Sequence, residues 1–168
     1  EDLQGLLSRV IRIPGKFRIR LSSIEPQQIS AGLIDLIAGE EKICGHLHIP
    51  LQSGDDHILR VMNRRYAVSD YLGLIGRIKE RINPVALSTD ILIGFPGERE
   101  EHVARTMDTI RAASFSRVHV FRYSERKGTA AAALREDIPR EKDVRARSQA
   151  IMRLGDELAE KFAQQFIE

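Results

Sequence analysis

The sequence predicts an α/β protein with parallel strands, part of a TIM-like partial (β/α) barrel. Three observations support this prediction. Four segments alternate apolar and polar residues as strands do, helical repeats separate them, and each strand also has a polar second face, unlike the strands of a closed barrel. We therefore expect an open, solvated concave surface that binds a ligand. The segments are Phe17–Glu25, Gly45–Ser53, Ala86–Gly97 and Arg117–Thr129.

Each expected strand lies at the start of its segment. In the second segment Leu47, Ile49 and Leu51 share one face, because side chains alternate along a strand. His46 and His48 fall on the other face, and the remaining segments repeat this pattern. The expected strands are Phe17–Ser22, Gly45–Leu51, Ala86–Ile93 and Arg117–Phe121.

Apolar residues at helical spacing predict a helix on either side of most strands. Ser69 is expected to cap the helix before the third strand, and Pro139 is expected to open the last helix. Between the fourth strand and that helix we expect a loop from Arg122 to Ile138. The expected helices cover residues 2–12, 27–38, 53–62, 69–82, 98–113 and 139 onward.

Composition limits the class of protein. The chain has 168 residues, enough for one domain, and a net charge of +2, which permits a nucleic-acid partner without requiring one. No apolar run reaches the roughly 18 residues of a membrane span, so we expect no membrane association. Cys44 is the only cysteine, so no internal disulfide can form and a cytoplasmic location is expected. His46 and His48 lack further ligands at suitable spacing, so we expect no metal site.

A glycine-rich string follows the third strand. Glycines let a ligand approach the main chain closely, and proline stiffens the turn. Ligands of α/β folds favour this junction between a strand end and a helix start. The alternative is a tight turn with an acidic helix start. The string consists of Gly94, Phe95, Pro96, Gly97 and Glu98.

Polar residues also end the first two strands. Gln52 and Ser53 can exchange hydrogen bonds with the hydroxyls of a ribose, although Ser53 could instead cap the next helix. Ser22, Ser23 and Glu25 close the first strand at the same mouth. Glu25 precedes a proline, so it could equally serve to keep the chain extended.

Charged residues suggest where a substrate binds. Asp90 points to the polar face, where it could orient an amine of the ligand or pair with Arg20. Arg126 and Lys127 belong to a loop after the fourth strand that also carries hydroxyls and an aromatic ring, the groups used for phosphate contacts and base stacking. Arg64 belongs to a second basic cluster near the mouth. The alternative for both clusters is a solvated surface.

Five motifs occur in an order that resembles the radical S-adenosylmethionine methylthiotransferases. Ser22 to Pro26 and Arg126 to Thr129 are most similar to the branch that acts on threonylcarbamoyladenosine in tRNA. Other branches act on isopentenyladenosine in tRNA or on a ribosomal protein, and they remain alternatives. The motifs are Arg18–Pro26, His46–Gly54, Met62–Tyr66, Thr89–Glu98 and His119–Thr129.

The resemblance implies a partial barrel that holds S-adenosylmethionine beside an iron–sulfur cluster. Family members carry two 4Fe-4S clusters, receive electrons from a reductant, and add a methylthio group to the modified adenine beside the anticodon. The resemblance implies no catalytic side chain in this chain. It implies substrate contacts from Arg64, Asp90, Arg126 and Lys127. It implies cofactor contacts from Ser22, Ser23, Glu25, Gln52, Ser53, Gly94, Phe95, Pro96, Gly97, Glu98, Phe121 and Tyr123.

The sequence departs from the family in its cysteines. The family uses C-x-x-x-C-x-x-C for one cluster and three further cysteines for the other, whereas this chain has Cys44 alone. We therefore expect residues 1–168 to be the C-terminal portion of a radical core domain, without its cluster domain, its cysteine motif or a C-terminal RNA-binding domain. This portion should be inactive, and its first strand should expose an edge that favours self-association. The alternative is an RNA-binding module without chemistry.

Overall fold

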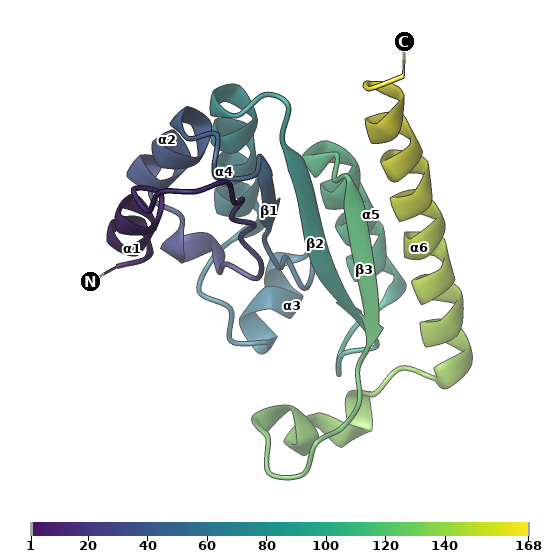
Figure 1. Cartoon of the computed structure of the whole chain (residues 1–168). Coiled ribbons are helices and arrows are strands. Elements are labelled where there is room, and N and C mark those ends of the chain that lie inside the picture. The colour runs from purple at the N-terminus through teal and green to yellow at the C-terminus, as the bar shows by residue number, and fades with distance from the viewer. Residues whose placement is uncertain (1, 168) are drawn as a thin grey trace.

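The computed structural model describes residues 2–167, and the side chains of all of these except 135–137. Its centre is a parallel sheet of three strands in the order β1, β2, β3 (Figure 1). Leu47 pairs with Leu87 between the first two strands, and Asp90 pairs with His119 between the last two. The predicted α/β class and parallel strands are therefore confirmed. The strands are β1 (His46–His48), β2 (Ala86–Ile93) and β3 (Arg117–Arg122).

Helices cover one face of this sheet. In Figure 1 the strands stand in front of α4 and α5, and α6 lies along β3, against which it packs. No helix ribbon crosses the front of the strands in this view, so one sheet face is open. The helices are α1 (Leu3–Val10), η1 (Pro26–Gln28), α2 (Ala31–Gly39), α3 (Asp56–Val61), α4 (Val68–Arg81), α5 (Glu100–Ala113), η2 (Ala130–Asp137) and α6 (Glu141–Gln164).

The apolar face of each strand forms the core. Leu47, Ile49 and Leu51 are at most 1% exposed, whereas His46 and His48 are only partly covered. This is the alternation that the sequence predicts. The core continues into the helices. Apolar side chains that are fully removed from water supply most of the favourable free energy of folding. Its largest members include Tyr71, Phe115, Leu33, Ile78, Leu87 and Ile91.

The prediction of a strand at Phe17–Ser22 is wrong. The segment at 17–22 is extended, but it forms only an isolated bridge, between Ile19 and Ile43. The Ile19 amide donates to the Lys42 carbonyl at 2.7 Å, and the Ile19 carbonyl accepts from Cys44 at 2.8 Å. Ser23 then adopts a φ of 54°, which turns the chain out of the extended conformation. The sheet therefore has three strands instead of four.

Several helix ends differ from the prediction. Ser69 is not the cap of α4, because the helix begins at Val68 and Asp70 accepts a hydrogen bond from the Ala67 amide at 3.1 Å. Helix α5 begins at Glu100, two residues later than expected, since Glu98 belongs to the preceding turn. The expected loop from 122 to 138 contains the short helix η2.

Candidate ligand site at the carboxyl ends of the strands

The chain that follows β1 joins the end of β2. The Gln52 amide donates to the Asp90 carbonyl at 2.8 Å, and the Gln52 carbonyl accepts from Leu92 at 2.9 Å. Gln52 has a φ of 67°, a conformation that is costly for a residue with a side chain and that often marks binding sites. Ser53 is 3% exposed, and its hydroxyl accepts from the Asp55 amide. Gln52 is thus the more available of these two predicted ribose contacts.

The Glu98 side chain accepts a hydrogen bond from the main chain of the glycine-rich turn. One of its carboxylate oxygens accepts from the Gly94 amide at 3.1 Å and from Arg147 at 3.3 Å. Burial raises the pKa of Glu98 above its ordinary value, although these two hydrogen-bond partners oppose the shift. The Glu98 side chain therefore stabilises the turn, in which Gly97 is partly exposed while Gly94, Phe95 and Pro96 are buried. Gly97 has a φ of 82° and open space where a Cβ would lie.

Two aromatic side chains join this turn to the end of β3. The rings of Phe95 and Tyr123 meet edge to face, with centroids 5.4 Å apart, and the Tyr123 amide donates to the Ile93 carbonyl at 2.8 Å. The Tyr123 hydroxyl is buried and has no hydrogen-bond partner among the described residues. Phe121 is 53% exposed beside it. A pocket of about 390 Å³ lies here, lined by Leu92, Phe121, Arg122, Tyr123, Ser124, Arg126, Thr129 and Ala131.

Glu25 and Arg64 bind one another. Their side chains form an ion pair at 3.1 Å, in which the carboxylate is 45% exposed and the guanidinium 29%. Ser22 and Ser23 lie exposed just before this pair, and Lys127 is exposed on the loop after β3. The ion pair thus ties the first predicted segment to the chain between α3 and α4, while the binding roles of these residues remain predictions.

Asp90 pairs with His48, whose Nε2 lies 3.1 Å from its Oδ2. The suggested pairing of Asp90 with Arg20 is therefore wrong, because Arg20 instead donates to His46. Sequence reasoning missed these histidines as site residues, along with Ser88, which lies between them. The alternation of apolar and polar residues already placed these side chains on the polar face. It could not show which of them meet, because that depends on the register between neighbouring strands.

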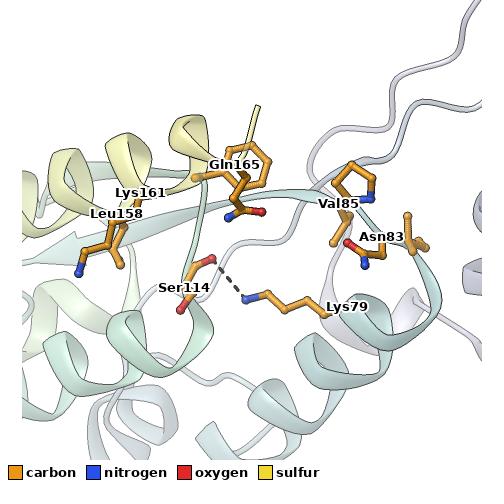
Figure 2. Close-up of a pocket in the computed structure, with 10 residues that line it drawn as sticks. Lys79, Asn83, Val85, Ser114, Leu158, Lys161 and Gln165 are labelled. Atoms are coloured by element: carbon orange, nitrogen blue, oxygen red, sulfur yellow. Dashed lines mark hydrogen bonds between the residues drawn. The ribbon is translucent and has the colours of Figure 1, made fainter. Parts of the chain in front are cut away.

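A second pocket, of about 280 Å³, lies at the opposite end of the sheet (Figure 2). Lys79 donates to the carbonyls of Ala113 and Ser114, at 2.6 and 3.4 Å, and burial lowers its pKa. Lys161 and Gln165 reach the same pocket from α6. The Lys79 ammonium caps the end of α5, which is a structural role.

Within residues 2–167, no three His, Cys, Asp or Glu side chains gather so as to hold a metal ion. None of the described helices is both long enough and apolar enough to cross a membrane.

These observations define a class: an α/β protein related to partial (β/α) barrels, with a candidate ligand site at the carboxyl ends of its parallel strands. Residues 1–110 match the Radical SAM superfamily, and the chain belongs to that superfamily. Its structure is similar to coproporphyrinogen III oxidase from Escherichia coli, with a TM-score of 0.74 and 19% identity over 92% of this chain and 37% of that one. At 19% identity, this structural similarity shows the fold alone.

Sequence relatives narrow the comparison. A tRNA-2-methylthio-N(6)-dimethylallyladenosine synthase from Caldicellulosiruptor saccharolyticus is 43% identical over 162 residues, 96% of this chain and 34% of that protein. A threonylcarbamoyladenosine tRNA methylthiotransferase from Thermotoga maritima is 36% identical over 141 residues, 84% of this chain and 32% of that protein. The chain thus spans about a third of the length of these curated relatives.

The site fits one of the groups that the superfamily implies. The unpartnered Tyr123 hydroxyl, the open space beside Gly97 and the exposed Phe121 suit a nucleoside such as that of S-adenosylmethionine. The chain does not fit a 4Fe-4S cluster, because Cys44 is its only thiol and a cluster needs several thiolates.

Proposed function

We propose that this chain is part of a radical S-adenosylmethionine enzyme that adds a methylthio group to threonylcarbamoyladenosine beside the anticodon of tRNA. One observation carries the proposal. Segments far apart in the sequence, around Gln52 and Tyr123, meet through main-chain hydrogen bonds at the end of β2, which leads into Gly94. These are segments of the motifs that resemble the methylthiotransferases, and both curated relatives described above are named for methylthiolation of tRNA.

The residues of this chain would bind and orient. Gln52 would contact the ribose, Phe95 and Phe121 would flank the adenine, and the Tyr123 hydroxyl would gain a partner in the bound nucleoside. S-adenosylmethionine and a cluster held by the parent protein would supply the radical chemistry. With a single cysteine, residues 1–168 would hold neither cluster and would be inactive alone.

The substrate side would involve charged residues. Arg64 lines a groove of about 480 Å³ with Arg60 and Arg65, and these three cations outnumber the two carboxylates there, Asp56 and Asp70, which would suit tRNA phosphates. Arg126 and Lys127 would add contacts from the loop after β3. A reductant and a cytoplasmic location complete the proposed setting.

A second candidate is methylthiolation of dimethylallyladenosine. The higher identity to the Caldicellulosiruptor enzyme, 43% against 36%, favours it. The serine pair Ser22 and Ser23 with Glu25 favours the threonylcarbamoyl branch. The two candidates share the site and the reaction, and differ in the group on N6.

Mass spectrometry of tRNA nucleosides separates the candidates. We expect that disrupting the gene in its host removes the methylthio form of threonylcarbamoyladenosine and leaves the unthiolated nucleoside. Loss of the dimethylallyl form instead would establish the second candidate. An unchanged content of both nucleosides would refute the proposed function.

A further inference from the structure

A row of hydrogen-bonding side chains crosses the open face of the sheet and ends at Asp90. Arg20 Nε lies 3.2 Å from His46 Nδ1, and His46 Nε2 lies 3.4 Å from the Ser88 hydroxyl. That hydroxyl lies 2.9 Å from His48 Nδ1, and His48 Nε2 lies 3.1 Å from Asp90 Oδ2. The row thus joins a cation at one end to a carboxylate at the other.

The Asp90 end of the row constrains its protons. A carboxylate oxygen only accepts, so His48 carries its proton on Nε2 and accepts on Nδ1 from the Ser88 hydroxyl. At the other end Arg20 has donors only, and its Nε and Nη2 lie 3.2 Å from Nδ1 and 3.0 Å from Nε2 of His46. Burial, with Arg20 as the next cause, lowers the pKa of His46, which agrees with a neutral ring.

The end of the row remains available to a ligand. The side chain of Asp90 is 22% exposed, and its Oδ1 has no hydrogen-bond partner among the described residues. His119 faces it from β3 in the paired register, and its ring centroid lies 5.8 Å from that of His48. A carboxylate oxygen without a partner beside an imidazole ring suits a planar group that carries an N–H.

We propose that Asp90 Oδ1 accepts the N6–H of the target adenine, and that Ser88 and His48 are positioning residues that hold Asp90 as an acceptor. This inference rests on the proposed function. An adenosine with one substituent on N6 keeps one N–H, so Asp90 would select it over an adenosine with two. A carboxylate can select in this way because an exocyclic amino group donates to it.

The test compares two anticodon stem-loop RNAs that differ only at the target base. One carries N6-methyladenosine, which has one N6–H, and the other carries N6,N6-dimethyladenosine, which has none. We expect the protein to bind the first on the order of tenfold more tightly, the value of one charge-assisted hydrogen bond. Asp90→Asn should abolish this preference, because its amide can present a donor to the base. The matched control Asp35→Asn, at an exposed carboxylate on α2, should keep it.

A second experiment measures the protonation of the positioning residues in the absence of RNA. Nitrogen NMR of the imidazole rings should show His48 protonated at Nε2, and Ser88→Ala should convert it to a mixture of tautomers and reduce the base preference. Equal binding of both RNAs, or a preference that survives Asp90→Asn, would overturn the inference alone. A His48 ring protonated at Nδ1 would overturn the proton assignment and the inference with it. Failure of the protein to bind either RNA would also overturn the inference, whereas the proposed function is tested separately by the tRNA nucleosides.

Discussion

Asp55 shows how one buried carboxylate stabilises the base of the candidate site. It is 4% exposed, it caps α3 by accepting from the Ile58 amide at 3.0 Å, and it forms an ion pair with Arg105 on α5. Burial alone would raise its pKa, but the Ile58 amide and Arg105 outweigh burial and lower it. Asp55 therefore joins a helix start to a neighbouring helix.

Replacing Asp55 by alanine should lower the free energy of unfolding by about 1–3 kcal/mol, because the helix cap and a buried acceptor are both lost. Asp55→Asn keeps an oxygen for the cap and should cost less. Since the folded pKa is depressed, the stabilisation is present above the ordinary pKa and disappears as pH falls through the folded value. Urea unfolding at several pH values measures this, and equal losses in both variants would contradict it.

Glu98 should show the opposite dependence on pH. Its folded pKa is raised, so between the ordinary and the raised value the folded state binds more protons than the unfolded state. The stability of the natural protein should therefore fall, relative to Glu98→Gln, as pH rises through this window. Parallel urea titrations of the two proteins check the sign. A difference that is constant with pH would refute it.

At the level of residues, sequence reasoning predicted the positions of the candidate residues in the fold better than the state of each side chain. It placed Gln52, Ser53 and Glu98 at strand ends, where they are found. It could not show that the Ser53 and Glu98 side chains turn inward, because that depends on Thr106 and Arg147, which lie about 50 residues away in the chain.

Among the elements, the packing of the β1–α3 connection on α5 can be tested most directly. A Cβ on Gly54 would lie 2.6 Å from Thr106 Cα and 2.7 Å from Thr109 Cβ. Gly54→Ala should therefore destabilise the protein by about 1–3 kcal/mol through overpacking. Gly39→Ala is the control, since it meets nothing within 4 Å and should be neutral or slightly stabilising. Thermal unfolding compares the two, and equal midpoints would contradict the packing.

The elements that sequence reasoning placed well are those with a strong period. The buried stripe of α4, with Tyr71, Ile75 and Ile78, was identified by spacing. The cap of that helix was missed, because an Asp70 side chain reaching back to Ala67 replaces the expected serine. The segment around Ile19 alternates like a strand, but a strand also requires partners, and Ile19 forms its bridge with Ile43 alone.

At the scale of the whole molecule, the two ends of the sheet differ. The carboxyl ends gather Gln52, the glycine-rich turn and Tyr123, whereas the amino ends hold the pocket that Lys79 lines (Figure 2). The parallel class followed from alternating strands and helices. Which residues meet at the candidate site depends on the register between the strands. The residue pattern of a single strand does not contain that register.

Titration of the isotopically labelled protein with S-adenosylmethionine, followed by amide NMR, tests the central claim most directly. We expect the shifts to concentrate at the carboxyl ends of the strands, on the amides of Gln52, Gly97 and Tyr123. Amides around Lys79 and Lys161 should stay unchanged. Shifts confined to that opposite pocket, or no shifts on the first set at saturating ligand, would contradict the claim that these strand ends form one nucleoside site.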